Sequence, residues 1–271
     1  MSSKKGASFL QWALPKMGYR WDGFRKPRNQ VLSRIRDRIQ DLGLAGGFDE
    51  YKRYLDNHPE EWDTLDQLCD VTISKFFRDR KVWDYLRDEA LPGILNDEPA
   101  SIWSVGCCNG EEAYSLAIIC KQLAEKTDRN ITSNDINILA TDRNEQVLSR
   151  ARKGCYPAGA LKELTDDEIS TYFRTLDDKH EDDYQIEERL KKFVDFEKRD
   201  IQDSLPDQTF DLILCRNLVF TYFTEERQAE FLDNLKPRMK KPSYLVIGSN
   251  ESLPKPGWLD VVSETHRVFG V

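Results

Sequence analysis

The stretch Ser101-Ile-Trp-Ser-Val-Gly106-Cys-Cys-Asn-Gly110-Glu111-Glu112 decides the fold of this chain. A short apolar run ends at Gly106, a tight turn follows, and an amphipathic segment begins at Glu111 and continues to about residue 126. A strand, a glycine turn and a helix in this order are typical of the first unit of a nucleotide-type α/β site. Gly106 lets the backbone approach a ligand closely, and Gly110 supplies conformational freedom where the helix begins.

Two carboxylates, Glu111 and Glu112, open that helix. A helix N-terminus favours anions, so a phosphate-binding loop would be expected to avoid carboxylates there. The Walker lysine and the three-glycine dinucleotide spacing are also missing from the sequence. A cationic or zwitterionic ligand fits better than a pyrophosphate, and S-adenosylmethionine, with its sulfonium and ammonium, is the obvious candidate. An ordinary βα turn with a solvated acidic cap is the alternative.

The composition predicts a globular chain without membrane insertion. The 271 residues are 39% hydrophobic and 32% charged, enough for one large domain or a main domain with a small accessory one. No apolar run approaches the ~20 residues of a membrane span, and the N-terminus lacks a secretory signal pattern. The six cysteines form no C-x-x-C pair, so we expect reduced thiols in the cytoplasm rather than disulfides or a metal site.

Charge is distributed unevenly along the chain. The net charge is −8, yet residues 1–40 carry ten Lys and Arg against two Asp and Glu. Such an asymmetry predicts contact with an acidic partner, and a solvated helix face is the alternative. No DNA- or RNA-binding motif accompanies the basic residues, so a nucleic-acid partner is not expected.

The first 70 residues are predicted to form a small all-helical domain, followed by an α/β domain over residues 71–271. Apolar residues recur at helical spacing over residues 31–42, 48–57 and 60–68. The stretch that follows, residues 70–79, holds two hydroxyls, a Phe-Phe pair and an arginine. Taken alone, it is read as an interdomain connector whose phenylalanines enter the core.

Polar residues follow several predicted strands of the α/β domain. Asp142 ends the strand 137–142, where its carboxylate can accept hydrogen bonds from ribose hydroxyls or cap the next helix. Asp200 ends a strand from residue 196, and Asn217 is the polar tip of the next strand, 210–217. A helix over residues 224–239, a strand over 244–248 and an edge strand over 266–271 complete the pattern. Strands alternating with helices predict a doubly wound, Rossmann-like sheet with its ligand across the strand C-termini.

Residues 154–199 do not fit a plain βα repeat. Two short strands are predicted at 184–188 and 192–197, after the acidic turn 177–183 that contains His180. We interpret this part, about residues 176–197, as an inserted β-hairpin subdomain. An insertion on a rigid α/β scaffold is a natural place for substrate selection, and His180 is expected to be solvent-exposed rather than catalytic.

Five separated motifs resemble the CheR-type S-adenosylmethionine-dependent methyltransferases, which methylate protein glutamates. They occur in the order and spacing of that family over about residues 30–253. The motifs are Thr72-Ile-Ser74-Lys-Phe-Phe-Arg78, Gly110-Glu111-Glu112-Ala-Tyr-Ser, Leu-Ala-Thr-Asp142, Cys215-Arg216-Asn217 with Tyr222-Phe223, and Gly248-Ser-Asn-Glu251-Ser.

The resemblance implies roles for residues at both ends of the cofactor. Thr72, Ser74 and Arg78 would contact the cofactor, with Arg78 bound to the cofactor's carboxylate. Glu112 would hold the cofactor's ammonium. At the other end the implied residues are Asp142 at the ribose, Asp200 and Ile201 beside the adenine, and Arg216 and Asn217 in the methyl-transfer pocket.

Tyr222 is the implied pocket tyrosine, although one extra residue after Asn217 leaves Thr221 as an alternative. The turn Cys-Cys-Asn-Gly also departs from the family, and the predicted hairpin lacks an obvious match to a receptor-docking surface.

A carboxylate acceptor suits the chemistry, because its pKa of about 4 leaves it ionised at neutral pH and no general base is needed. Tyr222 would orient the acceptor oxygen, and Arg78 or Arg216 would attract an acidic substrate. A small-molecule acceptor and a catalytically silent docking module remain the alternatives.

Overall fold

The structure is a computed structural model that describes residues 3–95, 99–127, 131–176, 184–254 and 257–271. The chain divides into two compact units. The helical unit comprises Met1–Val71 and Thr221–Ala229, and the α/β unit comprises Thr72–Phe220 and Glu230–Val271. In the described part of the chain, no helix is long and apolar enough to cross a membrane.

The helical unit is built from amphipathic helices that bury one face each. Its helices are α1 (Ser3–Ala13), α2 (Trp21–Phe24), α3 (Arg28–Asp41), α4 (Phe48–Asn57) and α5 (Glu61–Leu68), with a 3₁₀ turn η1 (Leu14–Met17). In α3 the residues Val31, Leu32, Ile35 and Ile39 are buried, which is the helical spacing seen in the sequence. Arg38 of α3 makes two hydrogen bonds to the carboxylate of Glu61, at 2.9 and 2.7 Å.

Residues Thr221–Ala229 join the helical unit although the sequence predicted them in the α/β domain. The ring of Tyr222 packs edge-on against Phe24 with 5.0 Å between centroids. Phe223 forms an antiparallel bridge with Tyr19, and their rings pack in a tilted arrangement with 5.5 Å between centroids. These aromatic contacts lie about 200 positions apart in the chain, so no local pattern predicts them.

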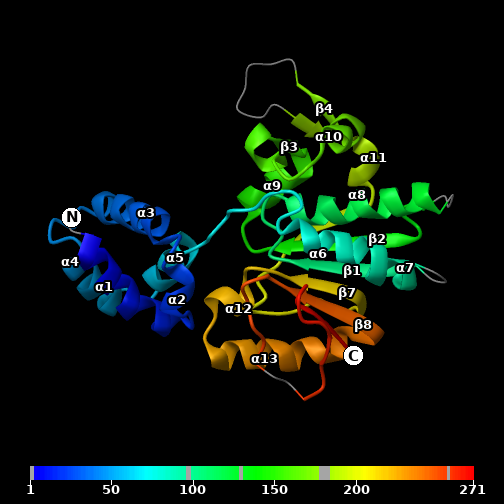
Figure 1. The fold of residues 1–271 in the computed structure, drawn as a ribbon. Helices are drawn as coiled ribbons and strands as arrows, with labels where there is room; N and C mark the ends of the chain where they lie inside the picture. The colour runs from blue at the N-terminus through cyan, green and yellow to red at the C-terminus, as the bar shows by residue number, and fades with distance from the viewer. Residues whose placement is uncertain (1–2, 96–98, 128–130, 177–183, 255–256) are drawn as a thin grey trace. The chain divides into compact units, whose positions relative to one another are not determined.

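The α/β unit contains the doubly wound sheet predicted from the sequence, with the strand order β6-β2-β1-β7-β8-β10-β9 (Figure 1). The first five of these pair in parallel, and β10 and β9 are antiparallel. The strands are β1 (Ala100–Val105), β2 (Ile136–Asp142), β6 (Val194–Lys198), β7 (Phe210–Cys215), β8 (Met239–Ile247), β9 (Asp260–Ser263) and β10 (Val268–Gly270). The C-terminal strand is therefore not an edge strand as predicted, because β9 pairs with its outer side.

Helices cover this sheet and bury its apolar residues. Both α8 (Glu111–Lys126) and α9 (Glu145–Lys153) pack against β2 and β6. The remaining helical segments are α6 (Arg80–Tyr85), the π turn η2 (Leu86–Ala90), α7 (Leu91–Ile94), α12 (Val219–Tyr222), α13 (Glu225–Leu235) and the 3₁₀ turn η4 (Lys236–Arg238). The last residues of the α12 segment and the first of α13 belong to the helical unit.

The inserted segment is a three-stranded sheet and not the predicted β-hairpin. It contains β3 (Cys155–Tyr156), η3 (Ala158–Leu161), α10 (Asp166–Tyr172), β4 (Phe173–Thr175), β5 (Tyr184–Ile186) and α11 (Glu188–Lys191). The small sheet has the order β3-β5-β4.

The prediction that residues 184–188 pair with 192–197 is wrong. Buried Leu190 anchors the helical turn α11 between the two segments, and β6 continues into the main sheet beside β2. An alternating pattern indicates a strand but does not identify its partner. The predicted acidic turn 177–183, with His180, lies outside the described residues.

Candidate functional site

The turn between β1 and α8 requires glycine at its first position. Gly106 has φ +68°, and a Cβ there would lie 2.5 Å from Cδ2 of Leu218. Cys108 at φ +56° and Gly110 at φ +88° continue the left-handed backbone. The sequence prediction that this turn has a special backbone is therefore confirmed, and α8 begins at Glu111 as expected.

Asp142, at the end of β2, is bonded to this turn. Its Oδ2 accepts a hydrogen bond of 3.0 Å from the backbone N–H of Cys108, and its Oδ1 accepts one of 2.9 Å from Asn144 N–H. The cap of α9 is Asn144, whose side chain accepts from Gln146 N–H. Asp142 is therefore not the capping residue, which removes the alternative role considered for it.

Glu112, in the first turn of α8, faces a buried arginine. One oxygen accepts a hydrogen bond of 2.8 Å from the Ser104 hydroxyl, and the other lies 3.3 Å from Nη1 of Arg216. Burial raises the pKa of the Glu112 carboxyl above its ordinary value, and the charge of Arg216 opposes that rise. Burial likewise raises the pKa of its neighbour Glu111.

Arg216 joins three parts of the site. Its side chain is only 2% exposed, and Nη2 lies 3.0 Å from Oδ2 of Asp79 and donates to the carbonyl of Arg78 at 2.7 Å. The guanidinium also lies over the ring of Trp83, 5.3 Å from its centroid. One guanidinium thus faces two carboxylates, those of Glu112 and Asp79, and the charge of Arg78 also acts on Glu112.

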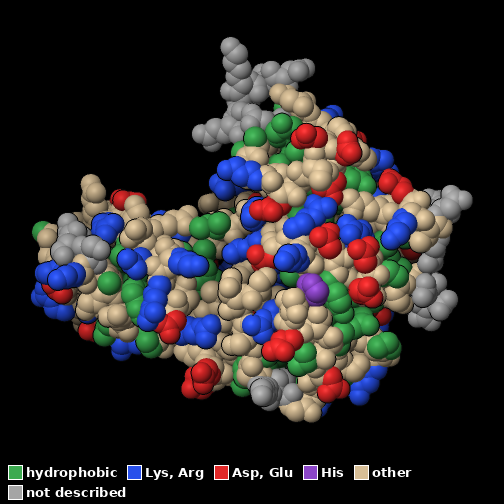
Figure 2. Space-filling model, viewed as in Figure 1, with side chains coloured by type: hydrophobic (Ala, Val, Ile, Leu, Met, Phe, Trp, Pro, Cys, Tyr) green, Lys and Arg blue, Asp and Glu red, His purple; other side chains and the backbone are tan. Residues whose placement is uncertain are grey.

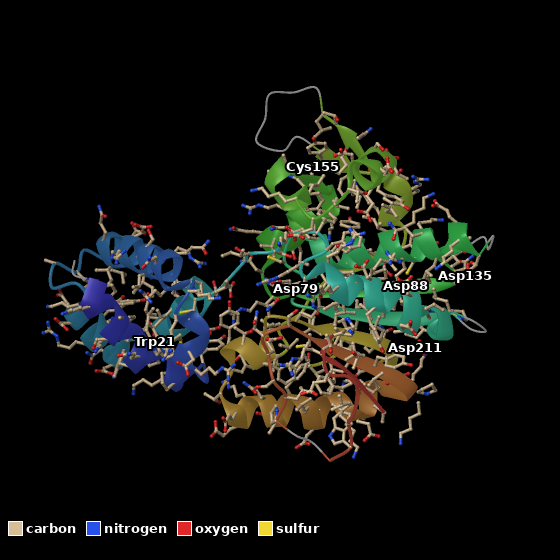
Figure 3. All side chains as sticks on the ribbon, viewed as in Figure 1. Trp21, Asp79, Asp88, Asp135, Cys155 and Asp211 are labelled. Carbon is tan, nitrogen blue, oxygen red and sulfur yellow. The ribbon has the colours of Figure 1, made fainter. Side chains whose placement is uncertain are left out.

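The connector that carries Thr72, Ser74 and Arg78 is anchored by buried phenylalanines. Phe76 and Phe77 are fully buried, as the sequence indicated, whereas the three polar side chains are half-buried. The carbonyl of Arg78 accepts hydrogen bonds from Trp83 Nε1, at 2.8 Å, and from Arg216. In Figure 3, Asp79 of this connector lies at the opposite end of the strands from Asp135, which precedes β2, and Asp211, near the start of β7.

Asn217, at the tip of β7, is held by a residue that the sequence analysis gave no role. Oε2 of Glu251 accepts hydrogen bonds from the N–H groups of Asn217, at 2.9 Å, and Gly248, at 2.5 Å. Asn217 has φ +57°, and a Cβ at Gly248 would lie 2.6 Å from its Nδ2. Glu251 is 3% exposed, and its place in the Gly248–Ser252 motif was the only signal in the sequence.

Asp200 lies near the tip of β2, two residues beyond the end of β6. Arg199 N–H donates to the carbonyl of Asp142 at 3.0 Å, and Arg143 Nη1 lies 3.6 Å from Oδ2 of Asp200. Asp200 Oδ1 accepts from Gln202 N–H at 2.9 Å, so the turn that contains Ile201 is closed by this carboxylate. The structure therefore places Asp142 and the Asp200 turn at the same edge of the sheet.

The two candidates for the pocket hydroxyl, Thr221 and Tyr222, belong to the helical unit. The carbonyl of Tyr222 accepts a hydrogen bond of 2.8 Å from Arg20 N–H, and the carbonyl of Thr221 accepts one of 2.9 Å from Arg20 Nε. Both residues are half-buried.

Two further features bear on ligands. An open cleft of about 440 Å³ lies over β2 and β6, and none of the predicted site residues lines it. Within the described ranges, no group of three or more His, Cys, Asp or Glu side chains is arranged to hold a metal ion.

Comparison with known proteins identifies relatives over most of the chain. Residues 72–268 match the family described as CheR methyltransferase, SAM binding domain. A chemotaxis protein methyltransferase of Borreliella burgdorferi is 35% identical over 84% of this chain and 81% of its own length. Chemotaxis protein methyltransferases of Listeria monocytogenes, at 32% identity over 77% and 76%, and of Escherichia coli, at 29% over 83% and 77%, are also similar.

Proposed function

The chain belongs to the CheR methyltransferase family and is a methyltransferase that uses S-adenosylmethionine, and we propose that its acceptor is a glutamate side chain of a protein. The observation that carries the proposal is the set of groups around the β1–α8 turn: Glu112, the Asp142 carboxylate bonded to the turn, and the Arg78 connector. The relatives are named chemotaxis protein methyltransferases, which supports a protein as the acceptor.

The residues around the turn fit the cofactor. The Glu112 carboxylate, held by Ser104 and Arg216, would pair with the ammonium of the cofactor. Gly106 leaves room for close approach of the ligand to the backbone, and the Asp142 carboxylate, bonded to the same turn, would accept hydrogen bonds from the ribose hydroxyls.

The other cofactor residues are proposed from the same edge of the sheet. Thr72, Ser74 and Arg78 would contact the amino-acid end, with Arg78 paired to its carboxylate through the planar fork of the guanidinium. Asp200 and Ile201 would flank the adenine, and Asn217 would line the pocket beside Arg216.

The cofactor supplies an electrophilic methyl group on a sulfonium, and the protein supplies position. A glutamate carboxylate is already ionised near neutral pH, so the site needs to orient the acceptor oxygen in line with the methyl group rather than to remove a proton. We assign Tyr222 to orienting that oxygen. Because Arg216 is buried between two carboxylates, attraction of the acidic substrate falls to the half-buried Arg78.

The basic N-terminal segment is the proposed docking region for an acidic protein surface. Figure 2 shows Lys and Arg side chains distributed over the helices of the helical unit. Ten of the basic residues fall within residues 1–40, and such a charge would steer an acidic partner by long-range attraction. We also propose a cytoplasmic location, in keeping with six cysteines that form no disulfide.

Transfer of a labelled methyl group from S-adenosylmethionine into a cell lysate tests the acceptor class. We expect label in proteins in the presence of wild type and none with Glu112→Gln, a variant of similar size without the charge. Label confined to small molecules would overturn the protein acceptor. Absence of label despite cofactor binding would favour a silent docking module.

A further inference from the structure

The backbone on both sides of Arg78 is left-handed although neither neighbour is glycine. Phe77 has φ +48° and Asp79 has φ +62°. A bulky side chain rarely adopts this conformation, and such residues persist only where the surroundings hold them in place. The direction in which the Arg78 side chain points therefore depends on the contacts that hold Phe77 in this conformation.

Phe77 is held through its ring by Trp83 and Arg80, and through its backbone N–H by the hydroxyl of Ser115, on the second turn of α8. Phe77 N–H donates to Ser115 Oγ at 3.0 Å, and Ser115 Oγ–H donates to the carbonyl of Glu111 at 2.6 Å. Ser115 is 0% exposed and Phe77 is 1% exposed. Because the proton of the hydroxyl is directed to Glu111, its lone pairs face Phe77, and water has no access to take its place.

Other contacts fix the connector before and after this point. Phe76 N–H donates to the carbonyl of Ala160 at 3.1 Å, and the carbonyl of Arg78 is bonded by Trp83 and Arg216. The peptide between Phe76 and Phe77 is thus bonded through Ser115 to the first turn of α8, which also carries Glu112. The Ser115 hydroxyl is therefore one link between the connector and the start of α8, beside the side-chain hydrogen bond between Ser74 and Glu111.

We propose that Ser115 is a positioning residue for cofactor binding: it holds Phe77 in the left-handed conformation and thereby sets the direction of Arg78. The inference rests on the proposed role of Arg78 at the cofactor carboxylate. Without the hydroxyl, the buried N–H of Phe77 lacks an acceptor, and the connector spends less time in the binding-competent conformation. The apparent affinity for the cofactor falls in proportion to the fraction of molecules in that conformation.

The test compares Ser115→Ala with Thr127→Ala. Thr127, the residue that caps the other end of α8, makes the same type of hydroxyl-to-carbonyl bond, 2.8 Å to Leu123. Calorimetry with S-adenosylhomocysteine should show an affinity about tenfold lower for Ser115→Ala and within twofold of wild type for Thr127→Ala. Thermal unfolding followed by circular dichroism confirms that both variants are folded.

A double-mutant cycle with Arg78→Ala separates positioning from general destabilisation. If Ser115 acts through Arg78, adding Ser115→Ala to Arg78→Ala should lower the affinity by less than twofold. A further tenfold loss in that background, or a Ser115→Ala single variant that binds like wild type, would overturn the positioning role. A wild-type protein that does not bind S-adenosylhomocysteine would instead overturn the cofactor site itself, and this inference with it.

Discussion

Glu251, to which the sequence patterns assigned no role, is predicted to stabilise the α/β unit. Its Oε2 atom accepts the N–H groups of Asn217 and Gly248, which follow the ends of the neighbouring parallel strands β7 and β8. Glu251→Ala removes the acceptor of both. Each buried N–H left without a partner costs about 1–3 kcal/mol, so we expect a loss of about 2–6 kcal/mol in the free energy of unfolding of the α/β unit.

Glu251→Gln is the matched comparison, because it keeps an oxygen acceptor of the same reach and loses only the charge. Hydrogen bonds to a charged group are about twice as strong as neutral ones, so we expect roughly half the loss seen for alanine. The charge also acts on Cys215: burial first, and Glu251 to a smaller degree, raise the pKa of that thiol. In the unfolded state neither burial nor Glu251 acts on the Cys215 thiol, so its pKa should be the same in Glu251→Gln and in wild type.

Urea unfolding measures both variants. The transition of the α/β unit is identified as the one that S-adenosylhomocysteine shifts to higher urea, because a ligand stabilises the unit that binds it. The expected order of midpoints is wild type, then Glu251→Gln, then Glu251→Ala. A Glu251→Ala protein with the midpoint of wild type would refute the view that this carboxylate ties the two strand ends together.

Four further predictions concern the site. Asp142→Ala should weaken S-adenosylhomocysteine binding by roughly ten- to a hundredfold in calorimetry, the cost of about 1.5–3 kcal/mol for a charged hydrogen bond, and equal affinity would remove the ribose assignment. Arg78→Lys should weaken binding although charge is kept, because lysine cannot form the bidentate pair, and unchanged binding and turnover would reduce the connector to a structural role. Burial raises the pKa of the Glu112 carboxyl, so ionisation of this group opposes folding. The free energy of unfolding therefore falls as pH rises through the raised pKa. Over the same pH range the carboxylate forms, so binding of an ammonium strengthens. A titration of affinity against pH should therefore rise for wild type and stay flat for Glu112→Gln. Tyr222→Phe should leave cofactor affinity near wild type and lower kcat, and an unchanged kcat would exclude the hydroxyl from orienting the acceptor.

The sequence predicted the parts of the site that depend on local patterns. The run into Gly106, the start of α8 at Glu111 and the strand ending in Asp142 follow from apolar periodicity and glycine placement within a few residues. The parallel sheet was confirmed for the same reason, since each strand reads as a short apolar run.

The remainder depends on contacts between distant residues. The segment 184–197 shows two strands, yet β5 pairs with β3 and β4 while β6 pairs with β2, and no local signal distinguishes these partners from a hairpin. Ser115 and Glu251 act on backbone N–H groups 38 and 34 positions away. Side-chain identity alone does not reveal such roles, because the partner is a backbone group that every residue except proline possesses.

The central claim is that this protein esterifies carboxylates of a protein substrate. Methyl esters of glutamate release methanol in mild alkali, whereas methylated amines and ethers do not. The most direct measurement is therefore the release of volatile label from the protein fraction after transfer from labelled S-adenosylmethionine and treatment with base. The account predicts volatile label with wild type and none with Glu112→Gln, and label that stays on the protein in base would contradict it.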